Sequence, residues 1–374
     1  MRVSPGSRFS KAVDARIGAF LSARRAAATA ISPDLAPVLD AVDALTTGGK
    51  RMRAGFLHWG WHAVAAARPG APRTTGSPED PEWEAVVSMA SAVEIFHAAA
   101  LAHDDVMDSS DTRRGAPSVH RRLEGVHRAS EWRGRAESFG VNGAILVGDL
   151  LLGWADDLAR AGAGALGPER GPAAMAVFST MREEVGLGQF LDVLEEAAWV
   201  RQDPASLLQR AHTVAVYKSA RYSVEAPLLI GATMAGASET QLEALSGYGV
   251  PVGTAFQMRD DILGVFGDPV VTGKPAGDDL REGKRTVLVE LARRQLSPGV
   301  RSMLDELLGD PGLDAVQIAT LQRTIADAGA LEQLETMIDR AVGGALEALR
   351  DAELSRGAVL ELERLAAAAA RRDS

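Results

Sequence analysis

Residues 83–108 read WEAVVSMASAVEIFHAAALAHDDVMD, and this stretch decides how the rest of the chain is interpreted. Its apolar residues recur at three- and four-residue spacing, which predicts a long helix in a protein core. It ends with the carboxylates of Asp104, Asp105 and Asp108. Asp104 and Asp108 are one helical turn apart, so their like charges destabilise the helix unless a cation lies between them. Oxygen ligands on a helix suit Mg²⁺, which keeps several waters and takes phosphate oxygens as further ligands.

Helix-type periodicity continues along most of the chain, because apolar residues recur three and four positions apart in one segment after another. These segments are 37–45, 139–160, 173–199, 204–235, 239–267, 286–295 and a last stretch, 299–372, that we expect to hold three or four shorter helices. Signals for strands are scarce, since aromatic residues make up 5% of the chain and no pair of alternating runs brackets an Asn-Gly or Asp-Gly turn. The predicted fold class is all-α.

Stretches rich in glycine, proline and short polar residues separate these segments and predict loops. They are Arg68–Pro81, Gly115–Arg135, Gly162–Pro172 and Gly267–Gly283. Their lengths suit connections between long helices rather than linkers between domains. We therefore expect a single large helical bundle over residues 1–374, with flexible ends at about residues 1–12 and 367–374.

The composition excludes several classes of protein. Hydrophobic residues make up 46% of the 374 residues and charged residues 24%, which is the balance of a soluble globular protein. The absence of cysteine excludes a disulfide framework, a thiolate zinc site, an iron–sulfur cluster and a cysteine nucleophile. A formal net charge of −10 argues against a nucleic-acid partner.

Neither a signal peptide nor a membrane span is expected. The N-terminal residues carry several charges and no apolar segment of the signal-peptide type. The best candidate for a span, Gly143–Ala155, is interrupted by Asp149 and is shorter than the roughly 18 apolar residues that cross a bilayer. The expected location is cytoplasmic.

A second acidic pair, Asp260-Asp261, follows Gln257 on another apolar helical segment. Position 264, one turn beyond Asp260, is glycine, so this site has fewer carboxylates than the first. Two such pairs on separate helices of a bundle form a stronger signal than one, because facing helices can aim both at one cavity.

Clusters of basic residues lie near the acidic pairs along the chain. In a protein of net charge −10, they indicate a polyanionic, metal-bound ligand; surface salt bridging is an alternative for any one cluster but a poor explanation of all of them together. The clusters are Gly48-Gly49-Lys50-Arg51-Met52-Arg53, Arg113-Arg114, Lys218-Ser219, Lys274 and Lys284-Arg285.

Two other motifs argue for different chemistry and are rejected. Gly267–Lys274 resembles a phosphate-binding loop, but Pro275 stands where Ser or Thr is required and no strand precedes it. Glu94–His97 and Glu124–His127 fit the Glu-x-x-His pattern of a di-iron bundle. Glu124 lies in an expected loop rather than on a core helix, which argues against that site.

Taken in order, the motifs match a known family. The chain resembles the all-trans polyprenyl diphosphate synthases from about residue 35 to 350. The resemblance implies an isoprenoid synthase fold, a homodimer, three bound Mg²⁺ ions and two substrates, isopentenyl diphosphate and an allylic diphosphate. The matching segments are Gly48–Arg53, His103–Asp108, Arg113–Gly115, Gly188–Asp192, Lys218-Ser219 and Gln257–Asp261.

The resemblance also implies roles for individual residues. Asp104, Asp108 and Asp260 match the Mg²⁺ ligands, and Asp105 and Asp261 complete the catalytic carboxylates. The isopentenyl diphosphate pocket corresponds to Lys50, Arg53, His97 and Arg114. The contacts to the allylic diphosphate correspond to Arg113, Lys218, Ser219, Gln257, Lys274 and Lys284. The chain departs from the family pattern at Ser219, where threonine is common, and at Gly264, which replaces a third aspartate.

The residues before Asp104 bear on product length, because in such synthases the growing chain runs along this helix away from the metal. Ala99 and Ala100 are too small to close a tunnel, and Phe96 lies about 12 Å below Asp104 along the helix axis. Phe96 is therefore either the floor of the tunnel or ordinary core packing. We expect a C20 product, geranylgeranyl diphosphate, with C25 or longer as the alternative.

Two other functions compete with this interpretation. A class I terpene cyclase shares the fold and the first acidic motif, but it leaves Lys50, Arg53 and Arg114 unexplained. A non-catalytic partner subunit would have lost its acidic pairs, and both are present here.

Overall fold

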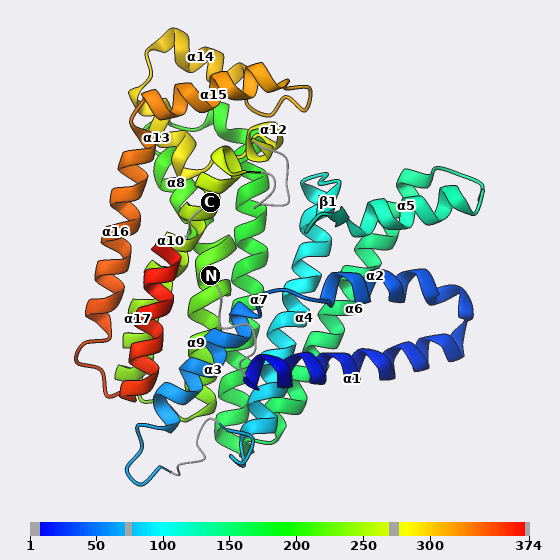
Figure 1. The fold of residues 1–374 in the computed structure, drawn as a ribbon, viewed down its shortest axis with the longest axis vertical. Helices are drawn as coiled ribbons and strands as arrows, with labels where there is room; N and C mark the ends of the chain where they lie inside the picture. Colours follow the sequence, from blue (N-terminus) through cyan, green and yellow to red (C-terminus); the bar gives the residue numbers. More distant parts are fainter. Residues whose placement is uncertain (1–7, 72–76, 269–276, 371–374) are drawn as a thin grey trace. The chain divides into compact units, whose positions relative to one another are not determined.

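The computed structural model describes residues 8–71, 77–268 and 277–370 (Figure 1). Helices dominate this part of the chain, and its only paired strands form one two-stranded ribbon. The prediction of an all-α fold is confirmed. The chain forms two compact units, which are described separately: an N-terminal unit of residues 2–176 and 230–237, and a C-terminal unit of residues 177–229 and 238–374.

The N-terminal unit is built around α4, whose apolar side chains are buried along most of its length. Glycine lets α6 approach α4 closely, since a Cβ at Gly162 would lie 2.7 Å from the carbonyl oxygen of Ala85. The elements of this unit are α1 (Arg8–Ile31), η1 (Pro33–Leu35), α2 (Ala36–Thr46), α3 (Met52–Ala65), α4 (Trp83–Met107), β1 (Thr112–Arg113), β2 (Ala116–Pro117), α5 (Val119–Ala129), α6 (Ala136–Gly164) and the start of α7 (Gly167–Ala198).

The C-terminal unit is arranged around α10, with α16 and α17 packed beside it (Figure 1). Small residues bring η3 against α10, because a Cβ at Gly253 would lie 2.6 Å from the Cα of Ala220. Its further elements are the rest of α7, η2 (Trp199–Arg201), α8 (Leu207–Val214), η3 (Ala215–Glu225), the start of α9 (Ala226–Met234), α10 (Glu239–Phe266), α12 (Asp278–Glu282), α13 (Val287–Gln295), α14 (Pro298–Leu307), α15 (Ala315–Asp327), α16 (Ala330–Ala348) and α17 (Arg356–Ala370).

Three expected loops contain helices instead, and one of these helices is the short α12 within 267–283. Helix α5 lies within the expected loop 115–135 and buries Val119 and Leu123, so packing against α6 stabilises a helix whose own signal is weak. Helix α7 begins at Gly167 and continues through Pro172, which was expected to end a loop. A Cβ at Gly171 would lie 2.4 Å from the carbonyl oxygen of Ala163, so close packing on the end of α6 holds this turn.

Other boundaries also differ from expectation. The expected N-terminal flexible segment is helical from Arg8 and buries Phe9, and the expected C-terminal one is helical up to Ala370 with Ala369 buried. The single helix predicted over 204–235 is divided into α8, η3 and α9, and η3 is a π-helix of 11 residues. Such i→i+5 segments are rare and are frequent at functional sites.

Two helices of the described chain, α4 and α6, are long and apolar enough to cross a membrane, although no span was expected. The most apolar window of α4 is 83% buried inside the fold, which identifies it as a core helix. The corresponding window of α6 is only 33% buried, so α6 presents an apolar face that the chain itself leaves uncovered.

Candidate active site

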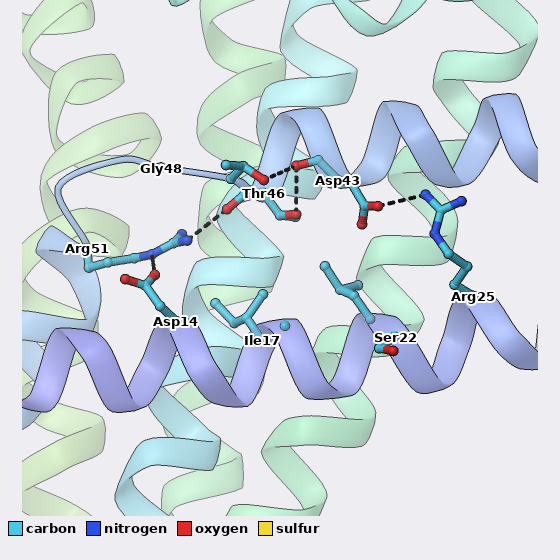
Figure 2. A pocket seen from close by; sticks show the side chains of 11 residues that line it. Asp14, Ile17, Ser22, Arg25, Asp43, Thr46, Gly48 and Arg51 are labelled. Atoms are coloured by element: carbon cyan, nitrogen blue, oxygen red, sulfur yellow. Dashed lines mark hydrogen bonds and ion pairs between the residues drawn. The ribbon is translucent and has the colours of Figure 1, made fainter.

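The turn before α3 holds the first basic cluster. Gly48, Gly49 and Arg51 have φ angles of 74°, 94° and 47°, a left-handed path that glycine adopts without strain. The Arg51 side chain donates to Asp14 at 2.7 Å and to the carbonyl oxygen of Thr46 at 2.8 Å (Figure 2). Arg51 therefore stabilises the turn, and this leaves Lys50 and Arg53 as the ligand-binding candidates in the cluster.

Glu94 of α4 fixes where α3 begins. Its carboxylate accepts a hydrogen bond from the backbone N–H of Ala54 at 2.9 Å and lies 3.6 Å from Arg51. An acidic group at a helix N-terminus is favourable, because the first N–H groups of a helix have no partner inside it. The Glu94 carboxylate thus has a structural role, because both of its contacts stabilise the start of α3. Glu124 is likewise held by Arg121 and Arg128 on α5, so both acids of the Glu-x-x-His pattern have structural partners.

A cavity of about 540 Å³ lies beside this turn, between α1 and α2 (Figure 2). Its charged lining is internally paired, Arg51 with Asp14 and Arg25 with Asp43. None of the described residues predicted for the active site lines it. The cavity is therefore separate from the predicted binding residues.

The ribbon of β1 and β2 presents two arginines from a tight hairpin. Its turn residues, Arg114 and Gly115, have φ angles of 53° and 75°, as a type I′ turn requires. The Arg114 guanidinium lies against Gly49, where an added Cβ would be 3.2 Å from Nη2. The hairpin therefore brings Arg114 to the turn that carries Lys50.

His97 on α4 belongs to the same cationic cluster. Burial lowers its pKa well below the ordinary value, and the charges of Arg53 and Arg114 lower it further. The imidazole is therefore neutral at pH 7 and acts as a hydrogen-bonding group. Arg53, His97 and Arg114, three of the four residues predicted for the isopentenyl diphosphate pocket, thus lie close enough to interact electrostatically.

The end of α4 carries the first acidic group. Asp105 is fully buried, and its Oδ1 accepts a hydrogen bond from Arg113 Nε at 2.8 Å. Arg113 Nη2 also lies 3.6 Å from Asp104, whose side chain is 22% exposed. Asp105 therefore positions Arg113, whereas the side chains of Asp104 and Asp108 are partly exposed at the end of the helix.

The residues predicted to control product length lie on the same helix. Ala99 is fully buried and Phe96 is 4% exposed, whereas Ala100 is partly exposed. Of these three positions, Ala100 is therefore the one where a larger side chain disturbs the packing of the core least.

In the C-terminal unit, Lys218 of η3 forms an ion pair with Asp192 of α7 at 2.5 Å. Gly188 lets the two helices meet, because a Cβ there would lie 2.4 Å from the backbone nitrogen of Lys218. The partner Asp192 was part of a motif recognised in the sequence, but no role was assigned to it. Asp192 could have been found from its four-residue spacing from Gly188, because this spacing places both residues on one face of the helix.

Gln257 and the second acidic pair lie on α10. Gln257 Nε2 donates to Asp261 Oδ1 at 2.7 Å. Burial, together with the neighbouring charges of Asp279 and Asp260, raises the pKa of Asp261 to about 8. Asp261 is therefore a buried, hydrogen-bonded group, and Asp260 is the partly exposed carboxylate of the pair.

Lys284 follows α12 and lies 2.6 Å from Glu282 and 3.9 Å from Asp279. Ser219 is on η3 next to Lys218 and is partly exposed. Lys274, a further predicted contact, lies outside the described residues. Sequence reasoning missed Asp279, although a further Asp-Asp pair, Asp278-Asp279, follows Asp260-Asp261 along the chain.

Over residues 8–71, 77–268 and 277–370, no three His, Asp or Glu side chains converge to hold a metal ion on their own. The carboxylates still fit Mg²⁺, because this ion is usually bound by one or two carboxylates together with waters and substrate phosphates. Asp104 and Asp108 provide such a pair, one turn apart and both partly exposed.

Comparison with known proteins identifies the family. The family model "Polyprenyl synthetase" matches residues 36–325. The geranylfarnesyl diphosphate synthase of Aeropyrum pernix is 35% identical over 67% of this chain and 71% of its own, and the geranylgeranyl diphosphate synthase of Methanosarcina mazei is 32% identical over 78% and 76%.

Among solved structures, a geranylgeranyl pyrophosphate synthase from Corynebacterium glutamicum, complexed with isoprenyl diphosphate and magnesium, is 35% identical. It covers 98% of this chain and 99% of its own, with a TM-score of 0.89. Together with the family match, this similarity extends over the segments that carry both acidic pairs and the basic clusters. The chain therefore belongs to the polyprenyl synthetase family, and it is a trans-prenyltransferase of the polyprenyl diphosphate synthase type.

Proposed function

We propose that this enzyme joins isopentenyl diphosphate head-to-tail to an allylic diphosphate in a Mg²⁺-dependent reaction and releases geranylgeranyl diphosphate. The observation that carries the proposal is the electrostatic grouping of Arg53 from α3 and Arg114 from the β1–β2 hairpin around His97, on the same helix that ends with Asp104 and Asp108. A terpene cyclase has no use for such a second anion pocket, because it acts on one diphosphate only.

Each substrate has its own set of residues in this proposal. Lys50, Arg53 and Arg114 bind the diphosphate of isopentenyl diphosphate, and the neutral His97 donates a hydrogen bond to it. The allylic diphosphate is bound by Arg113, which Asp105 holds in place, and by Lys218, which Asp192 holds in place. Ser219, Gln257, Lys274 and Lys284 complete these contacts.

The chain's residues promote departure of the allylic diphosphate by offsetting the negative charge that grows on it. Three Mg²⁺ ions, held by Asp104, Asp108 and Asp260, supply Lewis-acid stabilisation of that charge when bound. The double bond of isopentenyl diphosphate then attacks the allylic carbon, and the released diphosphate accepts the proton. The reaction needs no side-chain nucleophile. Binding of isoprenyl diphosphate and magnesium by the Corynebacterium glutamicum synthase supports this choice of ligands.

A C20 product is proposed from the side chains below Asp104. Ala100 leaves the part of the tunnel near Asp104 open. The bulky ring of Phe96, about two helical turns below Asp104, closes it. The relatives include geranylgeranyl and geranylfarnesyl diphosphate synthases, so C25 is the alternative.

A homodimer is proposed because α6 leaves an apolar stripe uncovered. Phe139, Leu146 and Leu150 lie on one face of α6 and are 40%, 61% and 42% exposed. A second copy of the chain would cover this stripe, and a covered α6 agrees with a cytoplasmic enzyme rather than a membrane-spanning one.

The proposed function predicts a defined product when the protein is incubated with isopentenyl diphosphate, Mg²⁺ and an allylic starter shorter than C15, either dimethylallyl or geranyl diphosphate. The wild type should release C20, Ala100→Phe should release shorter chains, and Phe96→Ala should release longer ones. Chain length is measured by mass spectrometry of the dephosphorylated products. No elongated product from any allylic starter would refute the function, and unchanged length in both variants would refute the role of α4 in setting it.

Asp104→Ala and Asp108→Ala should each reduce turnover by at least about 100-fold, because transition-state charge loses its metal-based stabilisation. The melting temperature should stay the same or rise, since one of two repelling charges is removed. Turnover is measured across a Mg²⁺ titration, with the exposed Asp327→Ala as the matched control. Near-wild-type turnover of either variant at saturating Mg²⁺ would contradict the metal assignment.

The two substrate sets predict separate kinetic effects. Lys50→Ala and Arg53→Ala should raise the KM for isopentenyl diphosphate by about 10- to 150-fold. This range corresponds to the loss of one charge-assisted contact that contributes roughly 1.5–3 kcal/mol to binding. Lys218→Ala should raise the KM for the allylic substrate instead. Arg135→Ala, at an exposed arginine, serves as the control. Equal effects on both substrates in all three variants would show that the assignment is wrong.

The dimer proposal predicts that Leu146→Glu, which places a charge in the middle of the stripe, lowers the molar mass measured by light scattering from two chains to one. Leu360→Glu, on an exposed leucine of α17, should leave the mass unchanged. A wild-type protein that is monomeric at micromolar concentration would rule out the dimer.

A further inference from the structure

The ring of His103, the residue before Asp104, lies directly above a glycine of α6. A Cβ added at Gly148 would lie 2.5 Å from Cδ2 and 2.6 Å from Cε1 of this ring. Both distances are shorter than any ordinary contact of a Cβ atom, so a side chain at position 148 and the imidazole exclude each other. Gly148 thus provides the space in which the His103 side chain lies.

A hydrogen bond and a nearby carboxylate of α6 hold the ring in this place. Nε2 of His103 lies 3.2 Å from the carbonyl oxygen of Ile145 and 3.4 Å from Oδ1 of Asp149. Because a carbonyl oxygen can only accept a hydrogen bond, Nε2 carries a proton and donates it to Ile145. Ile145 and Asp149 are four residues apart, so both groups belong to the helix face that the ring contacts.

This contact fixes one end of the antiparallel pair formed by α4 and α6. Towards the other end, Ser88 Oγ of α4 donates to the carbonyl oxygen of Leu158 in α6 at 2.9 Å. The distance from Ser88 to His103 along the axis of α4 is about 22 Å, at a rise of roughly 1.5 Å per residue. Helix ends fray more readily than helix centres, and α4 ends at Met107. His103 therefore holds the last turn of α4 in place on α6.

Asp104 lies between two residues whose side chains are both anchored. On one side His103 is held by α6, and on the other side Asp105 accepts a hydrogen bond from Arg113. The backbone that carries the Asp104 carboxylate is therefore fixed from both directions. Such fixing matters for Mg²⁺, because this ion demands a near-ideal octahedral arrangement of ligands at about 2.0–2.1 Å. A misplacement of about 1 Å in a site can reduce the rate about 100-fold.

We propose that His103 is a positioning residue for the condensation, because its contact with α6 fixes the direction in which Asp104 presents its carboxylate to Mg²⁺. This inference rests on the proposed function, which supplies both the metal and the diphosphate. Gly148 has a part in the same role, because any larger residue there pushes the ring away from Ile145.

The first test displaces His103 without changing the sequence of α4. Gly148→Ala places a methyl group where the ring lies. We expect kcat to fall about 10- to 100-fold, the usual effect of losing a group that orients a metal ligand, and half-maximal turnover to need more Mg²⁺. The KM for isopentenyl diphosphate should stay unchanged, because Lys50 and Arg53 are carried by α3 and the turn before it.

Gly153→Ala is the matched control, because it makes the same change on the same helix at a position where an added Cβ meets no atom within 4 Å. Its kcat and Mg²⁺ dependence should equal those of the wild type. A folded Gly148→Ala variant with the wild-type kcat and Mg²⁺ dependence would overturn the proposal.

The second test separates the hydrogen bond from the space that the ring fills. His103→Gln keeps an N–H donor at the same number of bonds from Cβ, whereas His103→Leu has no donor. The full-length protein is dialysed to equilibrium against Mn²⁺, which uses the same oxygen ligands as Mg²⁺, in the presence of inorganic diphosphate. We expect His103→Leu to bind Mn²⁺ about 10- to 100-fold less tightly than the wild type, and His103→Gln to recover at least part of the loss. Equal affinities of these two variants would contradict the role of the hydrogen bond.

A double variant provides a third readout, which depends on the contact itself. Once His103→Ala has removed the ring, the methyl group of Gly148→Ala has nothing to displace. The variant His103→Ala/Gly148→Ala should therefore lose no more activity than His103→Ala alone. Losses that multiply would show that the two positions act independently, against the proposal.

Two further measurements keep the outcomes separate. Melting temperatures identify any variant that fails to fold, and if Gly148→Ala fails, the comparison of His103→Gln with His103→Leu decides. Product formation by the wild type tests the proposed function, whereas Mn²⁺ binding tests His103 without turnover. Failure of one is thus distinguishable from failure of the other.

Discussion

The ion pair between Arg113 and the buried Asp105 is the interaction on which the N-terminal half of the site depends. It ties the β1–β2 hairpin to the end of α4, because a buried carboxylate needs a charged or hydrogen-bonding partner. The hairpin in turn carries Arg114 to the turn at Gly49, close to His97. A single buried charge thus determines where two arginines of the binding residues lie.

Much of the fold could be predicted from the sequence, because helices such as α4 and α10 are long and show clear periodicity. Helix α3 could not, since it is apolar on nearly all sides and has no periodic pattern to read. Helix α1 was overlooked, although Phe9, Val13, Ile17 and Leu21 recur every four residues. Helix α5 depends on its packing against α6, which a local reading of the sequence does not contain.

For the site, the sequence provided residue types and their family roles but not their environments. The charges around His97 come from two separate segments, 51–53 and 113–114, so its lowered pKa could not be inferred from either one alone. The position of Asp279 is similar, because only the folded chain places it at Gly264. By contrast, the one-turn spacing of Asp104 and Asp108 is a local property, and the sequence alone was enough to predict it.

The π-helical form of η3 has a consequence for insertions and deletions. Because its hydrogen bonds join residues five apart instead of four, η3 holds more residues than an α-helix of the same number of turns. Removing one residue between 219 and 225 would allow the segment to relax to an α-helix and would rotate Lys218 relative to the residues that follow it. The Lys218–Asp192 ion pair would then be out of register, so this segment tolerates substitutions better than changes in length.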